Sequence, residues 1–218
     1  MSKHHPDEVT LLDYSAGTLA MPQSLAVAMH LFLCDSCRAQ VKKLNSLGGA
    51  LLEQSEPRQV KVRDFDQFMA GIDKDGPGES ASAIEVPQAS ALRNPLHGFL
   101  PKRLEDIQWR QQTREIAEYD LTERLGVSGF RIGLQKISAG ARVPEHTHKG
   151  RELTVVLSGG FSDELGVYHE GDFVSRDGSH QHSPTALQNE DCICLTVLDA
   201  PLRFLGLYRL LNPFMHWS

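Results

Sequence analysis

The N-terminal third of the chain places its apolar residues at the spacing of amphipathic helices. Pro6-Asp7-Glu8 is a helix start signal, and a break at Met21-Pro22-Gln23 is expected before a second helix that ends at Leu33, with Ser24 as its N-cap. A third helix is expected over residues 35–53. A short fourth helix is expected around residues 64–72, with an apolar stripe that packs against its own domain or a partner and consists of Phe65, Phe68, Met69 and Ile72.

The second half of the chain changes to the shorter period of β-strands. Residues 131–137 alternate between polar and apolar, residues 153–157 are rich in Thr and Val, and residues 192–198 form a buried-looking apolar run. Glycine-rich turns separate these segments. Several short strands at such spacing predict a β-sandwich or a small barrel.

Between the two patterns the composition shifts to Gly, Pro, Ser and Ala without periodicity, which is typical of a flexible linker. A chain of 218 residues is long enough for two small domains. We therefore expect an α + β protein with a helical domain over residues 1–73, a linker over residues 74–92 that lets the two halves move separately, and an all-β domain over residues 93–218.

Composition narrows the class of protein. The hydrophobic content of 40% is enough for real cores, and the net charge of −6 argues against nucleic-acid binding through bulk electrostatics. The N-terminus lacks the apolar region of a signal peptide. The longest apolar run, residues 25–34, is shorter than the roughly 20 residues of a membrane span. We therefore expect a cytoplasmic protein that binds neither membrane nor nucleic acid directly.

The first candidate metal site is His30, Cys34 and Cys37, which have the spacing H-x3-C-x2-C. Thiolates and imidazoles are the ligands that zinc prefers, and a structural zinc site has four of them. The fourth ligand must come from elsewhere, and His4 and His5 are the candidates. A thioredoxin-like redox role for the two cysteines would require a βαβ setting, whereas the surroundings are helical.

The second candidate metal site lies in the β-rich half. Gly140, His146, His148, Glu152 and Gly159 follow the spacing G-x5-H-x-H-x3-E-x6-G. Two histidines two residues apart project from the same face of a strand, and the glutamate keeps that parity. Two imidazoles and a carboxylate suit Zn, Fe, Mn or Ni, so the ligand types alone leave the metal open.

The N-terminal pattern resembles the zinc anti-sigma domain of bacteria, a small helical domain that grips an extracytoplasmic-function sigma factor. The resemblance covers about residues 5–72. It implies that His5, rather than His4, completes the zinc ligands with His30, Cys34 and Cys37.

The second pattern resembles the first sequence motif of the cupins, which are jelly-roll barrels. In the second cupin motif, counted from Gly171, the histidine position falls on His182. His180 would share a strand face with His182, so parity leaves both open, while the motif register implies that His182 joins His146, His148 and Glu152. At three other positions of this motif, where the family has Pro, Gly and Asn, this chain has Asp177, Ser179 and Ala186 instead.

With both motifs in one chain, the sequence is similar to the ChrR-type zinc anti-sigma factors over nearly its whole length except the linker. Other segments that look like this family are residues 14–19, 34–39, 103–109, 191–195 and 199–204. The resemblance implies a negative regulator of transcription whose N-terminal domain blocks a sigma factor and whose cupin domain is needed for release under stress. In the best-known branch the stress is singlet oxygen.

The residues, considered without the family resemblance, are also compatible with other functions. A cupin metalloenzyme of the dioxygenase or isomerase type, with a zinc-binding regulatory appendage, is the main alternative, because a fold does not dictate a function. We favour the regulator and expect no catalytic residues, since no acid–base set stands out beyond the metal ligands. Cys192 and Cys194 are expected to be inert core thiols, because a buried cysteine packs like a small hydrophobic residue. The alternative is a redox sensor, which would need an accessible thiolate of lowered pKa, and the sequence leaves it open.

Overall fold

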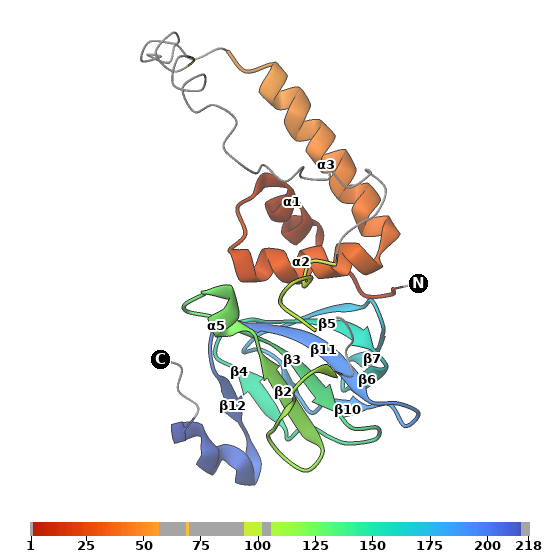
Figure 1. Ribbon diagram of the computed structural model, residues 1–218, viewed down its shortest axis with the longest axis vertical. Helices are drawn as coiled ribbons and strands as arrows, with labels where there is room; N and C mark the ends of the chain where they lie inside the picture. Colours follow the sequence, from red (N-terminus) through yellow and green to blue (C-terminus); the bar gives the residue numbers. More distant parts are fainter. Residues whose placement is uncertain (1, 57–68, 70–93, 102–105, 215–218) are drawn as a thin grey trace, which may run out of the picture. The chain divides into compact units, whose positions relative to one another are not determined.

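The structure, a computed structural model, describes residues 2–56, 69, 94–101 and 106–214 (Figure 1). The expected linker over residues 74–92 lies outside the described residues, as does the expected fourth helix apart from Met69. Residues 1–46 and 93–218 form one compact unit, and residues 47–92 form a second. The domain limits at residues 73 and 93 therefore remain predictions.

Helix α1 (Glu8–Ala16) begins where the sequence predicts. The Asp7 side chain accepts a hydrogen bond from the Thr10 backbone N–H at 2.7 Å, which caps the first turn. At the other end Gly17 adopts a left-handed conformation with φ of 70°, and its N–H bonds the last carbonyls of the helix.

Helix α2 (Met21–Leu33) begins earlier than predicted, so the assignment of Ser24 as its N-cap is wrong. Ala20 is the N-cap, and Pro22 lies in the first turn, where its missing N–H costs nothing. Ser24 lies inside the helix and its hydroxyl donates to the Leu19 carbonyl. Helix α3 (Asp35–Glu53) has the predicted limits.

In the part of the β-rich half that the structure describes, the strands form three antiparallel sheets. The largest has the order β1-β2-β3-β11-β5-β8, and two three-stranded sheets have the orders β10-β6-β7 and β12-β4-β9. The predicted strands over residues 131–137, 153–157 and 192–198 are β3, β5 and β11. The six-stranded sheet consists of β1 (Arg110–Gln111), β2 (Ile116–Asp120), β3 (Arg131–Ile137), β11 (Cys192–Leu198), β5 (Glu152–Ser158) and β8 (Phe173–Arg176). The smaller sheets consist of β10 (Thr185–Ala186), β6 (Gly160–Asp163), β7 (Gly166–His169), β12 (Leu202–Phe204), β4 (His146–His148) and β9 (Gln181–His182).

Two short helices complete the described chain. Helix α5 (Thr122–Leu125) follows β2, and the 3-10 helix η2 (Gly206–Phe214) follows β12. Apolar residues of the large sheet and of the sheet β10-β6-β7 form one buried cluster between them, so the strands enclose a core as in a barrel.

The central strands of the large sheet are buried on both faces. Alternate residues such as Val156 and Cys194 belong to the cluster between the sheets. Their neighbours Val155 and Leu195 belong to a second cluster, which also contains Val27 of α2. Two-sided burial explains the nearly continuous apolar run of β11.

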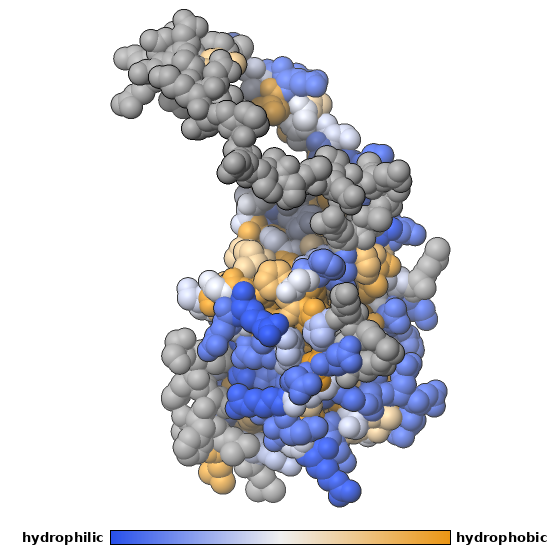
Figure 2. All heavy atoms as spheres, in the orientation of Figure 1, coloured by the Kyte–Doolittle hydropathy of each residue, from blue (hydrophilic) through white to orange (hydrophobic). Residues whose placement is uncertain are grey.

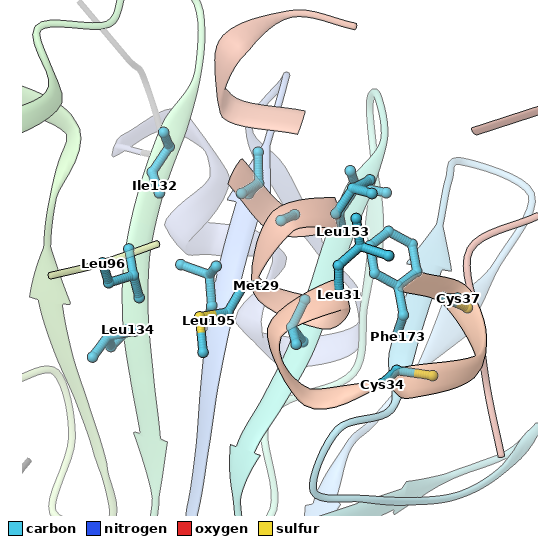
Figure 3. Packing of buried hydrophobic residues seen from close by; sticks show 14 of the residues in the cluster. Met29, Leu31, Cys34, Cys37, Leu96, Ile132, Leu134, Leu153, Phe173 and Leu195 are labelled. Atoms are coloured by element: carbon cyan, nitrogen blue, oxygen red, sulfur yellow. The ribbon is translucent and has the colours of Figure 1, made fainter. Parts of the chain in front are cut away.

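Helix α2 lies across β5 and β11 on the outer face of the large sheet (Figure 3). Its Met29 and Leu31 belong to the same buried cluster as Leu153, Leu195 and Phe173. Figure 2 shows polar residues over most of the visible face of the barrel and apolar residues gathered around the helices. Because the first two helices share a core with the barrel, these parts do not have the separation that the linker led us to expect.

We predict that Leu195→Ala destabilises the helices and the barrel together. Leu195 is fully buried under α2, so truncation should lower the free energy of unfolding by about 2–5 kcal/mol. Denaturant unfolding followed by helical circular dichroism and by aromatic fluorescence should show both signals shifting by the same amount.

The matched control is Leu165→Ala in the turn before β7, because Leu165 is 58% exposed and should change stability by about 0.5 kcal/mol or less. A shift of the fluorescence transition alone would contradict the shared core.

Candidate metal centres

Four side chains meet at the end of α2. His5 lies on the N-terminal arm, His30 lies in the last turn of α2, Cys34 follows that helix and Cys37 lies in the first turn of α3. One ligand atom from each lies within 4.8 Å of all the others. We call these four residues the N-terminal centre.

The tight turn between α2 and α3 brings the two cysteines together. Cys34 is the C-cap of α2 with an extended backbone, and its N–H bonds the His30 carbonyl at 2.8 Å. The chain then reverses into α3 within one residue. The Arg38 guanidinium donates to the carbonyls of Leu31 and Phe32, which have no partner within their own helix.

The N-terminal centre has the dimensions of a zinc site. The His5 Nδ1 atom lies 3.6 Å from Cys34 Sγ and 3.4 Å from Cys37 Sγ, and His30 Nε2 lies 3.3 Å from Cys37 Sγ. With Zn–N and Zn–S bonds of about 2.0 and 2.3 Å, tetrahedral nitrogen and sulfur ligands stand about 3.5 Å apart. The donor set therefore fits zinc both in type and in spacing.

Protonation at this centre favours metal binding by the histidine. His30 Nδ1 lies 2.7 Å from the Gly171 carbonyl oxygen, which can only accept, so Nδ1 carries the proton and Nε2 presents its lone pair to the centre. Burial lowers the pKa of His30 to about 4 and raises the pKa of the Cys37 thiol to about 11. A bound metal would replace the thiol protons, because only thiolates are ligands.

The second group lies within the barrel. His146 and His148 of β4 are joined by Glu152 of β5 and His182 of β9, and one ligand atom from each lies within 4.8 Å of the others. We call these four residues the cupin centre. His180, the alternative that strand parity left open, is partly exposed and bonds Asp177 instead at 2.9 Å.

The cupin centre contains buried polar atoms that a cation would satisfy. His148 Nε2 lies 3.1 Å from His182 Nε2 and 3.2 Å from Glu152 Oε2. Among the described residues, Glu152 Oε2 has no hydrogen-bond partner. Burial lowers the pKa of His148 to about 4, so this imidazole is neutral and does not neutralise the carboxylate. The residues therefore fit a divalent metal, and nitrogen and oxygen ligands suit zinc or another transition metal.

Asp163 orients one of these histidines, and the sequence carried no signal for it. This buried carboxylate accepts hydrogen bonds from His182 Nδ1 at 3.2 Å, from Arg176 at 3.0 Å and from the Tyr168 hydroxyl at 3.2 Å. Burial would raise the pKa of Asp163, but the bonds from His182, the Leu165 N–H and Arg176 outweigh it and hold this pKa well below its usual range. The bond to His182 leaves Nε2 free to face the centre, as in carboxylate–histidine–metal arrangements.

A cavity of about 300 Å³ adjoins the cupin centre. Glu152 lies in its wall, together with the ion pair Arg131–Glu118 and apolar residues such as Leu202 and Phe204. A smaller cavity of about 40 Å³ is lined by Glu152, His146 and His182. The arrangement can admit a small molecule beside the carboxylate ligand.

Cys192 and Cys194 are both buried in the barrel interior, and their sulfur atoms lie 3.5 Å apart. Their mutual hydrogen bond and burial raise the pKa of the Cys194 thiol. A thiol of this kind lacks the accessible thiolate that a redox sensor needs, in keeping with the expectation of inert core thiols.

Among the described helices, none taken singly is long and apolar enough to cross a membrane. Taken together, α1 and α2, which are bent by 111° relative to each other, have the length and composition that a membrane span requires, and this is all that the comparison of length and composition shows.

Comparisons with known proteins agree with this architecture. Residues 102–201 match the family described as the ChrR cupin-like domain. The chain is 38% identical over 214 residues to "Anti-sigma-E factor ChrR" of Cereibacter sphaeroides, covering 97% of both chains. It also matches the crystal structure of Rhodobacter sphaeroides SigE in complex with the anti-sigma ChrR, with a TM-score of 0.72, 34% identity, and coverage of 91% of this chain and 100% of that chain. The predicted fold class, helices followed by a cupin barrel, is thereby confirmed.

We predict about two metal ions per purified chain, one at each centre. Cys37→Ala and His182→Ala should each lower the metal content to about one equivalent, because each removes one of four ligands. Elemental analysis of the purified variants measures this directly, and zinc is expected at the N-terminal centre.

The chain offers a matched control for each variant. Cys192→Ala removes a buried thiol and His180→Ala removes a neighbouring histidine, and both should retain two equivalents. Equal metal content in Cys37→Ala and Cys192→Ala would contradict the N-terminal assignment, and equal content in the two histidine variants would contradict His182.

Proposed function

Because the chain belongs to the ChrR family of anti-sigma factors, we propose that it binds and inhibits an extracytoplasmic-function sigma factor and so acts as a negative regulator of transcription. The observation that carries this proposal is the full-length match to a named anti-sigma factor. That match spans the segments that hold both metal centres.

The same relative supports a regulator rather than an enzyme. The barrel alone would fit either class, because cupin folds serve both catalysts and binding proteins. A cavity beside Glu152 suits the recognition of a small molecule as well as its conversion. We propose no catalytic residues.

The second half of α3 offers a surface for the sigma factor. Leu47, Leu51 and Leu52 are 55%, 61% and 75% exposed, and Leu47 and Leu51, four residues apart, lie on the same side of the helix. A contiguous exposed apolar patch marks an interaction site, and an apolar helix face typically docks in a groove of its partner. The expected stripe Phe65, Phe68, Met69 and Ile72 lies outside the described residues apart from Met69, which is 39% exposed.

In this proposal the N-terminal centre has a structural role and the cupin centre has a regulatory role. Zinc at the N-terminal centre, held by His5, His30, Cys34 and Cys37, stabilises the turn from α2 into α3. Zinc or another divalent transition metal is held in the cupin centre by His146, His148, Glu152 and His182. Oxidative stress of the singlet-oxygen type alters the cupin domain and releases the sigma factor. The protein acts in the cytoplasm, without direct contact with nucleic acid or membrane.

We predict that the native protein co-purifies with a roughly stoichiometric sigma factor and that Leu51→Glu weakens the complex at least tenfold. A charge in the middle of an apolar contact surface loses burial energy and stays unpaired. Binding of the purified sigma factor can be measured by calorimetry. Leu165→Glu, in a turn of the barrel, is the matched control and should bind normally, and a complex unaffected by Leu51→Glu would place the interface elsewhere.

We predict that His146→Ala still represses the sigma factor but no longer releases it under stress. His146 lies in the barrel centre and not at the α3 surface, so its loss should disable sensing rather than binding. A reporter driven by the sigma factor, measured with and without singlet oxygen, should stay silent in the variant. Normal induction would rule out a sensing role, and enzyme-like turnover of an organic substrate by the wild-type protein would favour the cupin enzyme.

A further inference from the structure

The two metal centres meet opposite ends of one short segment, Gly171–Arg176. This segment consists of Gly171, Asp172 and the strand β8. At about 3.3 Å per residue, β8 is about 10 Å long from Phe173 to Arg176. Both ends contact residues that hold or orient proposed metal ligands.

At the first end the segment bonds His30 directly and the arm before His5 through its backbone. The Gly171 carbonyl accepts the bond from His30 Nδ1 at 2.7 Å. The Asp172 carboxylate accepts hydrogen bonds from the backbone N–H groups of Lys3 at 2.6 Å and His4 at 3.1 Å. The Phe173 N–H donates to the His4 carbonyl at 3.0 Å, so the arm that carries His5 is tied to the start of β8.

This contact is built into the fold rather than being a loose surface approach. Asp172 is 1% exposed, and its second oxygen accepts from the His169 N–H at 2.9 Å. Gly171 has a φ of +87°, and a Cβ there would lie 2.6 Å from the Ser2 hydroxyl. The ring of Phe173 lies edge-on to the His30 ring, close to the end of α2 that carries Cys34 (Figure 3).

At the second end the segment holds the cupin centre. The Arg176 guanidinium donates to Asp163 Oδ2 at 3.0 Å and to the Tyr168 hydroxyl at 2.5 Å. The same Asp163 oxygen accepts from His182 Nδ1, as described above. Arg176 is also the cross-strand neighbour of Glu152 in the register of β8 with β5. Arg176 therefore touches the surroundings of two proposed ligands.

We infer that β8 couples the two metal centres, so that a metal in the cupin centre strengthens metal binding at the N-terminal centre. Asp172 and Arg176 are the positioning residues at the two ends of the segment. His182 and Glu152 would be held in place when they ligate a metal, and Asp163 and Arg176, which contact them, would be held in place with them. The strand then presents the Gly171 carbonyl and the Asp172 carboxylate in place, so the N-terminal ligands lose less freedom on binding. The coupling needs no partner protein and goes beyond the proposed inhibition of a sigma factor.

The experiment uses the full chain with Co²⁺ as the probe. The charge-transfer band between thiolate and Co²⁺ reports the N-terminal centre alone, because none of the four cupin-centre residues contains sulfur. Titration against a chelator then gives the affinity of that centre. The double variant Cys34→Ala/Cys37→Ala removes both thiolates of this centre, so it should abolish the band and confirm its origin.

Emptying the cupin centre by His146→Ala, or independently by His182→Gln, should weaken Co²⁺ binding at the N-terminal centre about tenfold, within the usual range of coupling between sites. Asp172→Ala should weaken it about 10–100-fold, as expected for loss of a residue that orients ligands. Asp172→Asn should restore part of the affinity, since the amide oxygen still accepts from the arm. Asp191→Asn, which alters a carboxylate bonded to Ala139 and Lys136, should leave the affinity unchanged.

The route through β8 is tested in the Arg176→Gln background. If the strand carries the coupling, adding His146→Ala or His182→Gln to Arg176→Gln should cause no further loss at the N-terminal centre. Circular dichroism identifies any variant that fails to fold. If one of His146→Ala and His182→Gln fails to fold, the other one decides the result. Unchanged N-terminal affinity with an empty cupin centre would overturn the coupling, and full coupling in Arg176→Gln would overturn the role of β8.

Discussion

The packing of α2 across the outer face of β5 and β11 is the interaction on which the rest of this structure depends. Val27 and Leu31 of the helix share a buried cluster with Val155 and Leu195 of the sheet. Burial of this kind contributes about 25 cal/mol per Å² of apolar surface, and it sets where the end of α2 lies. That position brings His30 to the Gly171 carbonyl. The N-terminal centre is therefore assembled on the barrel as well as on its own helices.

Burial also explains why both centres are suited to metals. A buried imidazole loses its charge readily, as the lowered pKa of His30 and His148 indicates, and a neutral imidazole is a ligand. A buried carboxylate such as Glu152, in contrast, needs a compensating cation. The same low-polarity surroundings strengthen the hydrogen bonds through which Asp163 and Asp172 orient nearby groups. Each centre therefore depends on an acidic residue that is not itself a proposed ligand: Asp163 at the cupin centre and Asp172 at the N-terminal centre.

Several elements were predictable because their signals are local. The limits of α3 and β3 follow from periodicity, those of β11 follow from its apolar run, and the start of α1 follows from the Asp7 cap. The start of α2 was misjudged because Met21-Pro22 reads equally as a break or as a first turn. Parity could not separate His180 from His182, and the motif register favoured the histidine that the structure places among the other three.

By itself, the sequence determined the order of helices and strands and the two groups of candidate ligands, because spacing along one helix or strand sets which side chains share a face. The family resemblance implied His5 as the fourth N-terminal residue, and the structure places it there. Only the tertiary structure decided that Asp163 and Asp172 support the histidines and that β8 runs between the two centres. These contacts join residues far apart in the chain. Their positions depend on the packing of α2 on the sheet and on strand register, and neither leaves a local pattern in the sequence.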